Sequence, residues 1–215
     1  ANDGKKKTTT TTATSITATV EEQINNKTVP KKEEEDEAND GKKKTTTTSS
    51  TYQPEEIEVI SARAEEGSAT AQYLMALWYQ QGANGLKQSY VKAAVLYKKA
   101  ADQLFPDAMY DLAWMYHDGK GVVQSYQKAV YFFTMAVKRG YVKAMFELGE
   151  MHRCGQGVVQ SFRTAAKLYT MAADEGNVNA MFRLGLLHMQ GRGVAQSVKL
   201  ARKWWTKAAD EGNKN

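Results

Sequence analysis

The amino-acid sequence predicts an all-α protein, an α-solenoid of four helix–turn–helix repeats preceded by a tail without a core. Three observations predict this fold. A motif recurs every 36 or 37 residues, glycines and serines stand at fixed places in each copy, and no proline follows Pro106. Repeats of about 20 to 50 residues are typical of solenoids. The absence of proline suits unbroken helices.

The tail is predicted from composition. Residues 1–53 hold nine of the chain's 90 apolar residues and one of its 21 aromatic residues. So little apolar surface cannot offset the entropy lost on ordering, and we expect disorder over 1–53. Lysines at 31–32 and 42–44 loosely resemble a split nuclear-import signal, which favours the cytoplasm or nucleus. The glycosylation acceptor pattern at 26–28 keeps the secretory pathway open, so the compartment stays unknown.

Residues 54–215 carry the other apolar residues and form one predicted domain. A half unit at 54–70 should cap the N-terminal end as a helix, before units at 71–107, 108–143, 144–179 and 180–215. No apolar run is long enough to cross a membrane, so we expect no membrane insertion. The single cysteine excludes an internal disulfide.

The first helix of each unit opens on a repeated alanine, which we number position 1. The motif Ala-Met-Tyr-Asp-Leu-Ala at 108–113 returns at 144–149 and 180–185, with an earlier copy at 71–76. Positions 1, 5, 8 and 9 are apolar or aromatic at helical spacing and should face the core. Each first helix should end at a glycine, which adopts the left-handed conformation without a Cβ clash: Gly82, Gly119, Gly155 and Gly191.

The second helix follows a Gly-x-Gly-Val loop in three units and a Gln-Ser pair in all four. The serines should cap the helix N-terminus: Ser89, Ser125, Ser161 and Ser197. Small residues such as Ala136 and Ala172 should let helices approach closely. An aromatic residue should fill the remaining gap: Tyr97, Phe133, Tyr169 and Trp205. The second helices should end at Gly140, Gly176 and Gly212, with Leu104 in the corresponding place of the first unit.

This pattern resembles the Sel-one-like repeat family, a relative of the tetratricopeptide repeats. The resemblance covers about 54–215, with serine in place of the usual aspartate cap and His152 and His188 in place of a tyrosine. It implies a right-handed α-α superhelix of four repeats that binds other proteins. Some family members serve endoplasmic-reticulum quality control beside ubiquitin ligases, and others act in bacterial signalling.

Chemical sites are not expected. The Gly-x-Gly loops follow a helix, not the strand that a phosphate-binding loop needs, so they are interpreted as structural turns. His117, His152, His188 and Cys154 do not make a tetrahedral zinc site, and we predict no metal and no cofactor. Cys154 with His117 or His152 could serve as nucleophile and base, but a free thiol is preferred and no enzyme activity is expected. Lysines and arginines are scattered among acids, which argues against nucleic acid as a partner.

Positions 7 and 10 of the first helix vary between the units, although the framework around them repeats. First helices line the concave surface of such superhelices, which is the usual binding surface. The predicted partner-binding residues are Trp114, His117, Glu150, Arg153, Leu186 and Met189. The alternative is a solvated face without a partner.

The predicted function is a non-catalytic scaffold or adaptor that binds other proteins or extended peptide segments. The alternative is a regulatory or substrate-recruiting part of a larger assembly, such as a ubiquitin-ligase or quality-control complex. Self-association through the C-terminal unit, which no further repeat covers in this sequence, is a further expectation.

Overall fold

The computed structural model describes residues 52–212, which hold nine α-helices and no strand. The disorder predicted for 1–53 lies outside these residues, apart from Tyr52 and Gln53. None of the described helices is long and apolar enough to cross a membrane. The helices are α2 (Pro54–Glu65), α3 (Ala69–Gln81), α4 (Tyr90–Asp102), α5 (Pro106–Asp118), α6 (Tyr126–Lys138), α7 (Val142–Cys154), α8 (Phe162–Asp174), α9 (Val178–Gln190) and α10 (Val198–Gly212).

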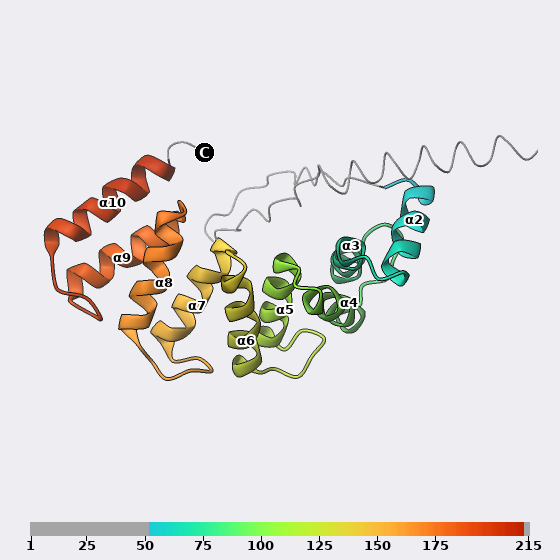
Figure 1. Cartoon of the computed structure of the whole chain (residues 1–215), viewed down its shortest axis with the longest axis horizontal. Helices are drawn as coiled ribbons and strands as arrows, with labels where there is room; N and C mark the ends of the chain where they lie inside the picture. Colours follow the sequence, from blue (N-terminus) through green and yellow to red (C-terminus); the bar gives the residue numbers. More distant parts are fainter. Residues whose placement is uncertain (1–51, 213–215) are drawn as a thin grey trace, which may run out of the picture.

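The helices pack in chain order, each against the one before and the one after, along a curved path (Figure 1). The prediction of an α-solenoid is therefore confirmed. Helix α2 packs on α3 at the N-terminal end. The Tyr52 ring lies 4.9 Å from the Trp78 ring, and Gln53 forms a capping box with Glu56. Tyr52 and Gln53, which composition assigned to the tail, thus contact the first two described helices.

The expected helix ends are present. The four glycines after α3, α5, α7 and α9 adopt left-handed φ angles between 66° and 73°. Each capping serine accepts a hydrogen bond from the backbone N–H three residues later, at 3.2 to 3.3 Å. Leu104 takes the left-handed conformation with φ 65°, where Gly140 and Gly176 stand in later units. Local sequence therefore fixes where the helices begin and end.

Each Gly-x-Gly loop connects the two helices of its unit and packs against the second helix of the preceding unit. A Cβ on Gly157 would lie 2.5 Å from the carbonyl carbon of Tyr126, the first residue of the preceding second helix. Gly121 and Gly193 approach Tyr90 and Phe162 in the same way. No side chain fits between these backbones, so the second glycine is required for packing. The interpretation of these loops as structural turns agrees with this geometry.

The core lies between the two helices of each unit and between neighbouring units. First-helix positions 1, 5 and 8 are buried as predicted, but positions 2 and 6 are buried too, and position 9 is only half-buried. Ala136 and Ala172 are fully buried, as expected for close helix contacts. The aromatic side chains of Tyr97, Phe133 and Tyr169 are buried beside them.

Candidate functional site

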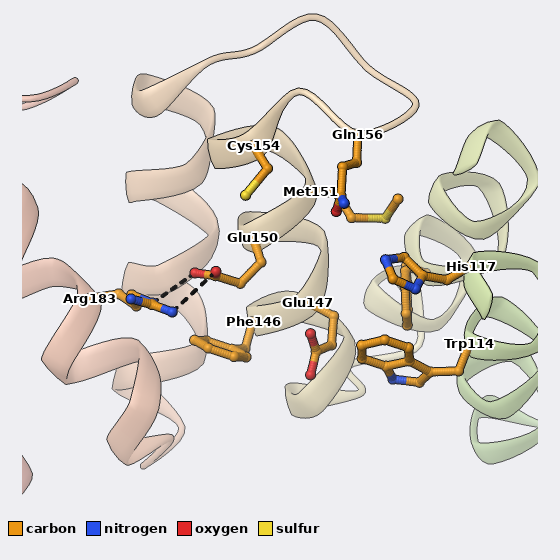
Figure 2. A pocket seen from close by; sticks show the side chains of 10 residues that line it. Trp114, His117, Phe146, Glu147, Glu150, Met151, Cys154, Gln156 and Arg183 are labelled. Carbon is orange, nitrogen blue, oxygen red and sulfur yellow. Dashed lines mark hydrogen bonds and ion pairs between the residues drawn. The ribbon is translucent and has the colours of Figure 1, made fainter. Parts of the chain in front are cut away.

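A pocket of about 260 Å³ opens between α5 and α7 (Figure 2). Trp114 and His117 come from α5, and Phe133 comes from α6 behind them. Helix α7 and the loop after it supply most of the opposite wall, and α9 adds one side chain. These residues are Phe146, Glu147, Glu150, Met151, Cys154, Gln156 and Arg183.

A second pocket of about 340 Å³ adjoins the first, and the two share Trp114 and Glu147. Its other lining residues come from α3 to α5, α7 and the loop after α5: Gln80, Tyr90, Tyr110, Asp111, Met115, Asp118, Lys120 and Lys143. We call the two pockets together the groove. First helices supply most of its surface.

The six predicted site residues do not all reach the groove. Trp114, His117 and Glu150 line the first pocket. Arg153 contacts the Glu150 carboxylate and lines neither pocket. Leu186 and Met189 are half-buried on α9 and also line neither. The structure therefore brings three of the six together around one opening.

The Glu150 carboxylate is the centre of an ionic network between α7 and α9. Arg153 Nη2 donates to Oε2 at 2.7 Å, and Arg183 Nε lies 2.9 Å from Oε1 (Figure 2 draws Arg183). The Tyr169 hydroxyl from α8 donates to the same carboxylate. Burial disfavours the ionised form of Glu150, but the Arg153 and Tyr169 hydrogen bonds and the two arginine charges outweigh it. The pKa of Glu150 is therefore lowered from its usual value.

Aromatic contacts hold Trp114 in place on the other side of the pocket. Its ring meets the Phe133 ring edge-on at 5.8 Å and the His117 ring at 4.9 Å. His117 Nδ1 lies 2.8 Å from the Asp118 carboxylate. Trp114 also packs against the buried core cluster around α5. This wall of the pocket is apolar and fixed by packing.

Position 4 of the first helices, which was not among the predicted site positions, supplies Asp111, Glu147 and Arg183 to the groove. Position 7 of one unit faces position 4 of the next. This register places Glu150 beside Arg183 and Trp114 near Glu147. The signal was present, because position 4 reads Leu, Asp, Glu and Arg in the four units and thus varies as positions 7 and 10 do.

No cluster of metal-ligating side chains is assembled among residues 52–212. No group of three or more histidine, cysteine, aspartate or glutamate side chains there could hold a metal ion. Cys154 is exposed and lines the first pocket, as His117 does. Figure 2 shows the Cys154 thiol on the side of Glu150, across the pocket from His117. His152 is half-buried, and burial lowers its pKa.

The four repeat units match a known protein family. The model of the Sel1 repeat matches four times, at residues 69–103, 106–141, 142–177 and 178–213. The chain belongs to the Sel1 repeat family. This confirms the resemblance to the Sel-one-like repeats. Sel1 repeat proteins are generally protein-interaction scaffolds, and their fold is typically non-catalytic.

Solved structures show the same fold. The protective antigen c5321 of uropathogenic Escherichia coli, which displays an SLR fold, is 32% identical with a TM-score of 0.70. A Sel1 repeat protein from Oxalobacter formigenes is 26% identical with a TM-score of 0.68. The matches cover 73% and 74% of this chain but only 33% and 62% of those proteins. The comparison with curated proteins finds no match.

Proposed function

We propose that this chain is a non-catalytic adaptor that binds an extended segment of another protein in the groove. One observation carries the proposal. An open pocket is lined by aromatic rings from three helices: Trp114, Phe133 and Phe146. At the neighbouring junction, between α7 and α9, ion pairs close the same surface. Concave sites with apolar walls and a few polar groups are the usual binding sites of proteins.

The shape of the groove favours an extended partner. The two pockets lie side by side and share Trp114 and Glu147, so one continuous segment can fill both. Tryptophan is enriched among residues that dominate interface energies. His117 and Glu150, which also line the first pocket, would add polar contacts to the partner.

Helix α10 is a less favourable binding surface for a second copy of the chain that would pack on it as a further repeat. Arg202 is exposed where Ala166 is buried in the unit before it, and Ala209 is exposed where Ala173 is buried. A charged side chain at a packing position disfavours docking of another helix. The groove is therefore our proposed partner surface, in preference to self-association through α10.

The wider setting of the adaptor is not part of this proposal. A regulatory or substrate-recruiting role in a larger assembly is compatible with the same groove.

Cys154 allows a direct test. It is the single cysteine of the chain, it is exposed, and it lines the first pocket. A phage library of random peptides is selected on the full chain, and enriched peptides are titrated before and after labelling of Cys154 with a bulky maleimide. Labelling should weaken binding at least tenfold, whereas maleimide treatment of Cys154→Ser should change nothing. Unchanged binding to the labelled chain, or no enriched peptide, would contradict the proposal.

A further inference from the structure

The junction between α7 and α9 shows how this chain itself surrounds a cation. Arg183 of α9 reaches the Glu150 carboxylate of α7, with its Nε 2.9 Å from Oε1. The rings of Phe146 and Tyr169 lie beside this pair, 5.8 Å apart, and the Tyr169 hydroxyl bonds to the same carboxylate. A guanidinium is thus held by a carboxylate next to aromatic rings.

The junction between α5 and α7 has the same kind of surroundings and an open volume. Glu147 stands at position 4, which is the place of Arg183 in the next unit, and position 7 of the preceding helix is Trp114. Both line the pocket of about 260 Å³ together with Phe133 and Phe146. Figure 2 shows the Glu147 carboxylate between the rings of Phe146 and Trp114.

The charges along the groove suit a cation as well. Four carboxylates line it: Asp111, Asp118, Glu147 and Glu150. Asp118 is bridged by Lys120 at 3.0 Å and Glu150 by arginines, while Lys143 is the remaining cation of the lining. Asp111 accepts a hydrogen bond from the Tyr73 hydroxyl at 3.1 Å. Glu147 already interacts with other groups of the chain. Glu150 shows that one carboxylate of this surface can bind two cations at once, Arg153 and Arg183.

We propose that the groove selects a segment carrying a lysine or arginine, whose charged group binds between the Trp114 ring and the Glu147 carboxylate. A cation over an aromatic face gains about 0.5 to 2 kcal/mol, most with tryptophan. The aliphatic part of such a side chain would lie along Phe146 and Met151, which line the same pocket. This inference rests on the proposed function and names the chemistry of the partner.

The test uses the full chain and four short peptides, acetyl-Ala-Ala-Xaa-Ala-Ala-amide with lysine, arginine, methionine or glutamate as Xaa. The chain has four tryptophans, so its NMR spectrum shows four indole N–H signals, and the Trp114→Phe variant assigns the one from Trp114. Addition of the lysine and arginine peptides should shift the Trp114 signal and saturate. The methionine peptide should bind at least fivefold more weakly, and the glutamate peptide should cause no shift.

Glu147→Gln separates recognition from folding. It keeps the size of the side chain and should abolish the preference for lysine and arginine over methionine. The matched control Glu175→Gln removes an exposed carboxylate that follows α8 and lines neither pocket, and it should keep that preference. Unchanged signals from the other three tryptophans will show that each variant is folded.

Each other outcome overturns the inference. Equal binding of the methionine peptide, an unchanged preference in Glu147→Gln, or no shift with any peptide would do so. The proposed function fails separately. The selected phage peptides could lack basic residues and still lose binding when Cys154 is labelled. That result would contradict only the cation preference and would keep the groove as the binding site.

Discussion

Two neighbouring junctions of the solenoid are built from equivalent positions but end in different states. Between α7 and α9, Glu150 and Arg183 close the surface with an ion pair. Between α5 and α7, Trp114 and Glu147 flank an open pocket. The backbone around the two junctions repeats, so the difference lies in four side-chain positions: position 6, position 7, the aromatic residue of the second helix, and position 4 of the following first helix.

Gly149 allows the closed state. A Cβ at this position would lie 2.6 Å from Cε1 of Tyr169, so only glycine lets the ring pack so closely on α7. The Tyr169 hydroxyl then reaches Glu150, and the carboxylate also binds Arg183. In the preceding unit Ala113 stands at position 6, Phe133 has no hydroxyl, and Trp114 packs edge-on against it. These three differences, together with Arg183 in place of Glu147 at position 4 of the following helix, separate the ionic contact from the apolar wall.

Gly149→Leu should have the largest effect, because the new side chain would overlap the Tyr169 ring. Overpacking of this kind should destabilise the domain by about 3 kcal/mol. Lys167→Ala on the exposed face of α8 should change the free energy of unfolding by less than about 0.5 kcal/mol. Urea unfolding measures both. Equal costs would mean that Gly149 does not set the distance between α7 and Tyr169.

Trp114→Ala should weaken phage-selected peptides at least tenfold, because it removes the largest apolar surface of the pocket. Leu77 occupies the same position one unit earlier and lines neither pocket, so Leu77→Ala should leave affinity unchanged. Arg153→Ala should affect binding less than Trp114→Ala, since Arg153 contacts Glu150 and not the opening. The affinities are measured by fluorescence anisotropy, with thermal melts as the check on folding. Equal losses in Trp114→Ala and Leu77→Ala would place the binding site elsewhere.

Glu150→Gln should test the ionic junction through its pH dependence. The folded-state pKa of Glu150 lies below its usual value of 4.5, so its charge stabilises the fold above that pH. This contribution disappears as pH falls through the lowered folded-state pKa. The wild type should therefore exceed Glu150→Gln by about 1 kcal/mol at pH 7, a modest value because both arginines are partly exposed. The difference should shrink towards pH 3. A difference that is equal at both pH values would show that the network contributes no charge-dependent stability.

Leu104→Gly should have the smallest effect, and it should be stabilising. Gly140 and Gly176 adopt the left-handed conformation in the loops before α7 and α9, whereas Leu104 adopts it, with φ 65°, in the loop before α5. Relief of this strain, less the added freedom of glycine in the unfolded chain, should raise stability by about 0.5 to 1 kcal/mol. Little packing is lost, because Leu104 is 45% exposed. A lower melting temperature would show that Leu104 packs more strongly than its exposure indicates.

Most of the fold could be predicted from the sequence because its signals are local. Glycines, serines and helical periodicity lie within one unit and mark the ends and inner faces of α3 to α10. The groove is formed by contacts between units, and the sequence predicts only part of these contacts. Variation at positions 7 and 10 pointed to Trp114, His117 and Glu150, but the register that pairs position 7 with position 4 is a tertiary feature. For the same reason the sequence did not separate Leu186 and Met189 from the residues that line the groove.

Methionine methyl groups can report on the two junctions in one NMR titration. Met151 and Met115 line the groove, while Met189 lies on α9 and lines neither pocket. The full chain is labelled with ¹³C at its nine methionine methyl groups and titrated with the tightest phage-selected peptide. If the α5–α7 junction is the open, partner-binding part of the solenoid, the Met151 and Met115 signals should shift to saturation and the Met189 signal should stay in place. A shift of Met189 without a shift of Met151 would contradict that claim.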